Sequence, residues 1–241
     1  MLRLIALPAT LSLLMSCQMT DPGSPTTTRE QRLVLGQTVI DDCVRSECGR
    51  LNLDSQLVED YSQVAALTHV TSFMASYTDF SDLSDIAAMS QLRELHIGQS
   101  GVRDLSGLSS FPNLRLLHAQ GLSDATYDEI AQLVQLEELA VGRASLTDLS
   151  FLTPLRRLKA LNLDNATIGS FAGLAGHPSI ERLSLNGAVL PDDISGLRSM
   201  RNLKQISVIP DNLSDDQRDV IDDLNARGVE VMFIVVAVVV C

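Results

Sequence analysis

A short repeat with a fixed period constrains the fold of this chain more than any other feature of its sequence. Successive segments begin with an aliphatic residue at intervals of 22 positions, at Val70, Leu92, Leu114, Leu136, Leu158 and Ile180. Another segment begins at Leu203, one position later than the period requires, and a degenerate one begins at Cys48, a full period before Val70. A fixed period of this length is typical of solenoids, in which one unit cannot bury its apolar face alone and stacks on its neighbours.

Each unit carries the pattern of a short strand near its start. Apolar residues recur three and five positions after the first residue, as Leu51/Leu53, Phe73/Ala75, Leu95/Ile97, Leu117/Ala119, Leu139/Val141, Leu161/Leu163, Leu183/Leu185 and Ile206/Val208. This alternation is typical of a strand that is buried on one face. We therefore expect parallel strands about 4.8 Å apart, which together line a face on the order of 40 Å long.

The second half of the unit carries signals for short helical turns. The motif Asp-Leu-Ser occurs at 82–84, 104–106 and 148–150. An Asp in this position accepts hydrogen bonds from free backbone N–H groups at the start of a turn. In two other units we expect a longer, true helix, over 127–134 after Ser123-Asp124 and over 217–224 after Ser214-Asp215.

The segment LRELHIGQSGVRDLSGLSSF, which begins at Leu92, resembles the 22-residue leucine-rich repeats of internalin-like bacterial proteins. The resemblance covers about 48–208. It implies an α/β solenoid, shaped as a horseshoe or arc, with parallel strands on the concave face and short helices or 3-10 turns on the convex face. The chain departs from this family where the repeat has Asn, because it has Ser100, Ala144, Ala166 and Ala188 there. We expect the hydrogen-bond ladder of those Asn side chains to be lost.

The N-terminus has the pattern of an export signal. Residues 1–16 combine one basic residue, Arg3, with an apolar stretch that is too short to span a bilayer. The following Leu14-Met15-Ser16-Cys17 resembles the lipobox of bacterial lipoproteins. This resemblance implies cleavage before Cys17, lipidation of its sulfur and attachment to the membrane; Gln18 resembles the outer-membrane default. The alternative is an ordinary signal peptide cut near Ser16, with Cys17 incidental.

The remaining segments complete the expected domain organisation. We interpret 17–32 as a flexible tether, 33–47 as an N-terminal cap, 48–228 as the repeat domain and 229–241 as a capping strand with an apolar tail. Outside the cytosol, Cys43 and Cys48 are close enough in sequence to form a disulfide, and the alternative is two free buried thiols. Cys241 is either free or paired between molecules.

Composition excludes several classes of partner. The formal net charge is −12, from 18 basic and 30 acidic residues. Nucleic-acid binding and polybasic attachment to anionic lipids both need clustered Lys and Arg, so we expect neither. No Gly-rich phosphate loop and no oriented nucleophile is evident in the sequence, and the acidic doublets lack a calcium-loop pattern. We therefore expect no enzymatic activity, no cofactor and no small-molecule substrate.

The residues between the inward apolar positions form the candidate binding face. From them we select Asn52, Asp54, Met74, Glu94, His96, His118, Gln120, Glu138, Asn162, Asp164, Arg182 and Asn186. His96 and His118 occupy the same position in adjacent units, near Glu94 and Glu138. They form either a metal or proton-sensitive site or merely two exposed histidines that share a repeat position.

Two functions remain open at this point. The first is a lipid-anchored module that binds an unknown protein partner at the bacterial cell envelope. The alternative is a structural or assembly component of the envelope without a dedicated ligand on the concave face. A fold of this kind does not decide between them.

Overall fold

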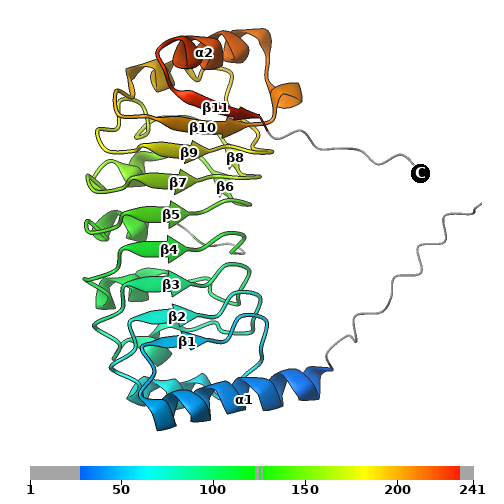
Figure 1. Ribbon diagram of the computed structural model, residues 1–241, viewed down its shortest axis with the longest axis vertical. Coiled ribbons are helices and arrows are strands. Elements are labelled where there is room, and N and C mark those ends of the chain that lie inside the picture. Colours follow the sequence, from blue (N-terminus) through cyan, green and yellow to red (C-terminus); the bar gives the residue numbers. More distant parts are fainter. Residues whose placement is uncertain (1–27, 123–124, 126, 234–241) are drawn as a thin grey trace, which may run out of the picture.

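The computed structural model describes residues 28–122, 125 and 127–233. In this part of the chain, nine strands form one sheet in the order β1-β2-β3-β4-β5-β7-β9-β10-β11. They are β1 (Arg50–Asn52), β2 (Ser72–Met74), β3 (Glu94–His96), β4 (Leu116–His118), β5 (Glu138–Ala140), β7 (Ala160–Asn162), β9 (Arg182–Ser184), β10 (Gln205–Val208) and β11 (Glu230–Phe233). Every pairing in this sheet is parallel, and the strands stack along the long axis of the molecule (Figure 1). The predicted solenoid is confirmed.

The register of the sheet brings equivalent positions of successive repeats together. Leu95 pairs with Leu117, and Leu139 pairs with Leu161. All the residues predicted to point inward from the strands are at most 2% exposed. Burying one such aliphatic side chain contributes about 1.5–3 kcal/mol. The repeat period therefore fixes a continuous apolar core, as the sequence predicts.

Seven of the repeats leave the sheet through a residue in the left-handed region of backbone space. Positive φ angles recur at the same position in the seven repeats that begin at 48 to 180, at Ser55, Tyr77, Gln99, Gly121, Arg143, Asn165 and Gly187. The N–H group of each residue from Ser55 to Asn165 in this series donates to a carbonyl of the next repeat, as Gln99 does to Gln120 at 2.8 Å. The left-handed conformation costs a non-glycine residue about 1–2 kcal/mol. The hydrogen-bond ladder, which continues past the strands, offsets this cost.

Where the repeat of internalin-like proteins has Asn, this chain has Ser100, Ala144, Ala166 and Ala188, and the three alanines are buried. Ala144 and Ala166 directly precede two further short strands, β6 (Ser145–Leu146) and β8 (Thr167–Ile168), which pair parallel to each other. The N–H of Thr167 donates to the carbonyl of Ala144 at 2.8 Å. Backbone hydrogen bonds thus connect the repeats beside positions where an Asn side chain is missing.

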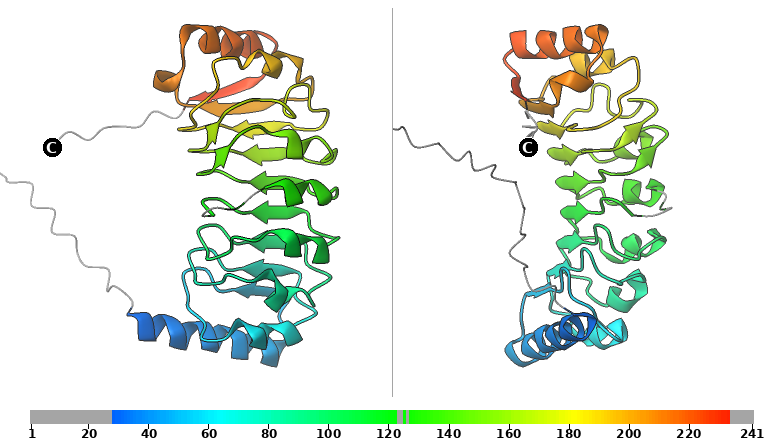
Figure 2. Two further views of the ribbon diagram at one scale, coloured as in Figure 1. Left: turned by 180° about the vertical axis from the view of Figure 1, so that it is seen from behind. Right: turned by 90° about the vertical axis from the view of Figure 1, so that its right-hand side faces the viewer.

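Short 3-10 helices lie on the side opposite the strands (Figure 2, right). They span Tyr61–Ala66, Leu83–Ile86, Ser106–Ser110, Asp128–Gln132, Ser150–Leu152 and Ser195–Ser199. The carboxylates of Asp82, Asp104 and Asp148 each accept a hydrogen bond at 2.8 Å from the N–H group two residues ahead. This is the role predicted for the Asp-Leu-Ser motif.

One predicted helix is wrong in type. Residues 127–134 do not form an α-helix, and only Asp128–Gln132 is helical, as a 3-10 helix. Tyr127, Ile130, Leu133 and Leu136 are all buried, and they are spaced three residues apart. That spacing matches the three residues per turn of a 3-10 helix. Burial of every third side chain determines the conformation here.

An α-helix, α1 (Arg29–Ser46), caps the first repeat. It begins earlier than the cap expected from residue 33, so residues 29–32 of the expected tether are helical. The reason is a capping box at Thr28: its hydroxyl accepts from the N–H of Gln31, whose side chain accepts from the N–H of Thr28. Cys43 and Cys48 are joined by a disulfide, which ties the end of α1 to the start of β1.

The last repeat ends in a second α-helix and a strand. The 3-10 helix Pro210–Asn212 leads into α2 (Asp215–Ala226), and β11 then pairs with β10. The helix predicted over 217–224 is confirmed. The predicted signal peptide, Cys17, most of the predicted tether, the tail from residue 234 and Cys241 lie outside the described residues. Within the described ranges, no helix has the length and apolarity that a membrane span requires.

Candidate functional site

The solvent side of the nine-stranded sheet, here called the strand face, carries all the selected candidate residues. Those within strands are Asn52, Met74, Glu94, His96, His118, Glu138, Asn162 and Arg182. Those two positions beyond a strand are Asp54, Gln120, Asp164 and Asn186. Each side chain is half-buried or exposed. The alternation of the repeat therefore presents them to solvent on one gently curved surface (Figure 2, right).

His96 and His118 contact each other on neighbouring strands. Their ring centroids are 4.5 Å apart and the rings are nearly perpendicular. His118 is also within hydrogen-bonding distance of Glu138, with 3.1 Å between Nε2 and Oε1. Partial burial lowers the pKa of His96, and the adjacent His118 lowers it further. Among the described residues, no group of three or more His, Cys, Asp or Glu side chains is placed to hold a metal ion.

This histidine pair predicts a loss of stability in mild acid. Since the pKa of His96 is lowered in the folded chain, the unfolded chain binds that proton more readily. The free energy of unfolding should therefore fall as pH drops below about 6.5, and the loss should end below the folded-state pKa. Urea unfolding at several pH values measures this, and His96→Gln should remove part of the acid-induced loss.

Histidine NMR supplies the control for this prediction. His118→Gln should raise the pKa of His96 partway towards its ordinary value, because the electrostatic effect of His118, which lowers that pKa, is gone. The buried His177, whose pKa is also lowered by burial, should keep its titration unchanged. An ordinary pKa for His96 in the unmodified chain would contradict the prediction.

Glu94, expected near the histidines, lies on the same strand as His96 and interacts with it electrostatically, and it also joins a polar group at the first strands. Its Oε2 accepts from the guanidinium of Arg50 at 3.0 Å and from the hydroxyl of Ser72 at 2.8 Å. Arg50 and Glu94 lie on β1 and β3, on either side of Ser72 on β2. The charge of this arginine is therefore compensated within the chain.

A second polar group is centred on Asp164. Its Oδ1 accepts from the hydroxyl of Ser184 at 2.6 Å and from the N–H of Asn186 at 2.8 Å. Its Oδ2 accepts from the side-chain amide of Asn162 at 3.0 Å. Both carboxylate oxygens are thus engaged. Three of these four residues are candidates selected from the sequence, and Ser184, which completes the group, is not among them.

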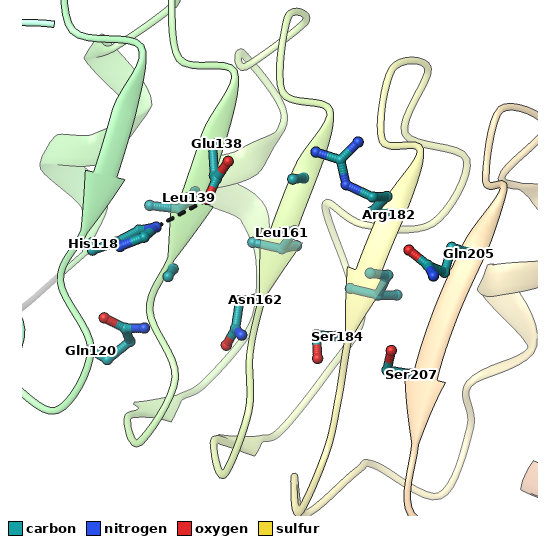
Figure 3. Close-up of a pocket in the computed structure, with 13 residues that line it drawn as sticks. His118, Gln120, Glu138, Leu139, Leu161, Asn162, Arg182, Ser184, Gln205 and Ser207 are labelled. Carbon is teal, nitrogen blue, oxygen red and sulfur yellow. Dashed lines mark hydrogen bonds and ion pairs between the residues drawn. The ribbon is translucent and has the colours of Figure 1, made fainter. Parts of the chain in front are cut away.

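A hollow of 290 Å³ lies on the strand face between β4 and β10. Its lining residues are His118, Gln120, Glu138, Leu139, Ala140, Ala160, Leu161, Asn162, Arg182, Leu183, Ser184, Gln205 and Ser207. Figure 3 shows Glu138 with its bond to His118 at one side and Arg182 at the other. Ala140 and Ala160, on the two strands between His118 and Arg182, leave the space open because they have no side chain beyond Cβ.

Sequence reasoning missed this hollow, although five of its lining residues are among the candidates. The selection omits Ala140, Ala160 and the mildly polar residues of β10, because none of them suggests chemistry by itself. The signal was present, since the two alanines follow larger residues at the same positions of the preceding repeats, His118 and Glu138. A hollow is marked by where side chains are short, and a search for reactive groups does not detect that.

Comparison with solved structures gives several similar folds. An internalin, InlF, from Listeria monocytogenes has a TM-score of 0.63 at 21% identity, over 75% of this chain and 55% of that chain. Internalin C2 from the same organism has a TM-score of 0.57 at 22% identity, over 64% of this chain and 68% of that one. A leucine-rich-repeat protein from Leptospira interrogans has a TM-score of 0.57 at 18% identity, over 71% and 45%.

These likenesses concern the fold. The chain spans little more than half the length of the internalin InlF that it matches. No family model matches the chain, and no curated protein is significantly similar to it in sequence. The parallel sheet, the 3-10 helices on the opposite side and the similar structures together establish that this chain folds as a leucine-rich-repeat solenoid.

Proposed function

We propose that this chain is a lipid-anchored bacterial lipoprotein that presents its solenoid for protein–protein interaction at the cell envelope. The observation that carries the proposal is the strand face, a mostly polar surface that no described residue covers and that contains a hollow of 290 Å³. Concave, well-formed surfaces with a few convergent polar groups are where proteins bind ligands. The internalins and the Leptospira protein share the fold, and they support the proposal by analogy alone.

Support for the anchor comes from the sequence before the described residues. The apolar stretch that ends in Leu14-Met15-Ser16-Cys17 provides the cleavage and lipidation signal. Only the segment 18–28 then separates Cys17 from the first residue of α1. An extended chain of that length spans at most about 40 Å. The solenoid would therefore be held close to the membrane, and Gln18 favours the outer membrane.

The anchor predicts a clear change on replacing Cys17. In the bacterial cell, Cys17→Ala should abolish lipid labelling and move the protein from the membrane fraction to the soluble fraction. Two or three acyl chains hold a protein durably at the membrane, whereas a protein without an acyl chain is not held there. Metabolic labelling with a fatty-acid analogue and cell fractionation measure both effects. Cys241→Ala is the matched control and should stay labelled; labelling that persists without Cys17 would disprove the anchor.

Crosslinking in the native cell tests the binding function. The captured partner should be lost when Ala160→Arg fills the floor of the hollow. It should be retained in Ala172→Arg, which adds the same charge at an exposed position outside the strand face. Capture of the same partner by both variants in equal amounts would rule out the strand face as its binding surface.

A structural or assembly role is the second candidate, and one observation favours it. Met232 and Phe233 on the last described strand are 42% and 53% exposed, which is unusual for large apolar side chains. An apolar segment follows them in the sequence. Self-association that disappears on deletion of 235–241, with no foreign protein captured, would favour this role over binding.

A further inference from the structure

We propose that the hollow over Ala140 and Ala160 is a subsite for an acidic side chain of the protein partner, and that Arg182 is the residue that binds it. The proposal rests on the proposed binding function and names the chemistry of the partner. It is carried by Arg182, a cationic donor beside the hollow that makes no hydrogen bond and no ion pair with the described residues.

Among the described residues that line the hollow, Arg182 is the one with a permanent positive charge, and the carboxylate of Glu181, next to it in the chain, is bonded to Lys204. Within the described part of the chain, the guanidinium of Arg182 makes no hydrogen bond and no ion pair. Its neighbours across the sheet are Ala160 and Gln205, neither of which carries a charge. In Figure 3 the guanidinium extends from β9 towards β7, over the hollow.

Other basic residues along the same sheet are compensated. Arg50 pairs with Glu94 at 3.0 Å, Lys159 with Glu137 at 3.1 Å and Lys204 with Glu181 at 2.8 Å. Arg50 and Arg182 are the two arginines within the described strands of this sheet, and only Arg50 has a carboxylate within ion-pair distance. Planar guanidinium groups bind carboxylates through two parallel hydrogen bonds, which is the strongest interaction available to this side chain.

Two carboxylates at or near the hollow already accept hydrogen bonds within the chain. Glu138 is bonded to His118 at 3.1 Å, and both oxygens of Asp164 accept hydrogen bonds. The side chains of Gln120 and Ser207, which also line the hollow, make no hydrogen bond with the described residues. Gln120 and Ser207 can each donate or accept, whereas the unbonded guanidinium of Arg182 can only donate, so the hollow favours an acceptor with negative charge.

The hollow also sets the shape of the ligand. Glu138 and Arg182 occupy the same position on strands two apart in the sheet, which separates their backbones by about 10 Å. Ala160 lies between them and leaves room for an inserted side chain. An acidic side chain can thus enter over the alanine floor and meet Arg182.

Methyl NMR of the mature chain with labelled alanines tests the proposal, because Ala140 and Ala160 form the floor of the hollow. The probes are the peptides acetyl-Ala-Glu-Ala-amide and acetyl-Ala-Gln-Ala-amide, with sodium acetate as a third ligand, all at equal ionic strength. We expect the Glu peptide to shift both methyl signals and the Gln peptide and acetate to shift them much less. Arg182→Gln should weaken binding of the Glu peptide about tenfold, which is the loss of affinity typical of removing one hydrogen-bonded charge.

Arg50→Gln is the matched control, since it removes an arginine of the strand face that is already paired with Glu94. It should leave the peptide shifts unchanged. Equal shifts from the Glu and Gln peptides, equal shifts from acetate, or shifts that survive Arg182→Gln would each overturn the proposal. If the crosslinked partner is still lost in Ala160→Arg, the binding function stands although this subsite does not.

Discussion

Leu117→Ala is expected to lower the free energy of unfolding by about 2–5 kcal/mol, whereas the adjacent Leu116→Ala should cost less than about 1 kcal/mol. The two residues are neighbours on β4 and undergo the same chemical change. Leu117 is 0% exposed and pairs in register with Leu95 and Leu139, whereas Leu116 lies half-buried on the strand face. The difference arises because only the inward side chain leaves a cavity in the core.

Urea unfolding followed by circular dichroism measures both variants. In a solenoid each repeat contacts only its neighbours, so a cavity in a central repeat weakens both of its interfaces. Leu117→Ala should therefore also broaden the transition, as the two halves begin to unfold separately. Leu152→Ala, another fully buried leucine in a 3-10 helix, should show a similar loss. Equal losses in Leu116→Ala and Leu117→Ala would contradict the assignment of the two faces.

The sequence was sufficient to predict the solenoid for a physical reason. Side chains alternate between the two faces of a strand, and a shift of one residue would expose the whole apolar set. With Leu95, Leu117 and Leu139 one period apart, only a parallel register offset by that same period buries all of them. The apolar pattern of one repeat is a weak signal, but the same pattern at the same positions of successive repeats determines the fold.

What could not be predicted are features set by backbone geometry. The left-handed residue three positions after a strand is glycine at Gly121 and Gly187 but Tyr77, Gln99 and Arg143 in other repeats. These side chains disfavour the conformation, so the sequence gives no local signal for it. The hydrogen bonds to the next repeat impose it, and those exist only after the repeats have stacked.

The candidate site was predicted in part. Alternation indicated which residues point to solvent, and the contact between His96 and His118 follows directly from their shared repeat position. The pairing of Arg50 with Glu94 spans two strands, and neither residue could be assigned its partner from spacing. The hollow depends on short side chains on β5 and β7, whose importance is visible only in three dimensions.

Gly142 shows how closely the repeats approach beside this hollow. A Cβ atom added to Gly142 would overlap the backbone carbonyl oxygen of Asp164 in the next repeat. Backbone cannot move aside there, because the N–H of Arg143 donates to that same carbonyl at 2.9 Å. Gly142→Ala should therefore lower the free energy of unfolding by about 1–3 kcal/mol, the usual cost of overpacking.

Gly98 occupies the equivalent position two repeats earlier and is the matched control. There the added Cβ would lie 3.0 Å from Oε1 of Gln120, the end of a flexible side chain that can rotate away. Gly98→Ala should be close to neutral, since it also reduces the entropy of the unfolded chain. Chemical denaturation measures the free energy of unfolding of both variants. Equal losses would show that the contact with Asp164 does not cause the destabilisation expected of Gly142→Ala. Because Asp164 also holds Ser184 and Asn162, a displaced carbonyl at Asp164 should alter the alanine methyl signals of the hollow more in Gly142→Ala than in Gly98→Ala, where only the end of the Gln120 side chain moves.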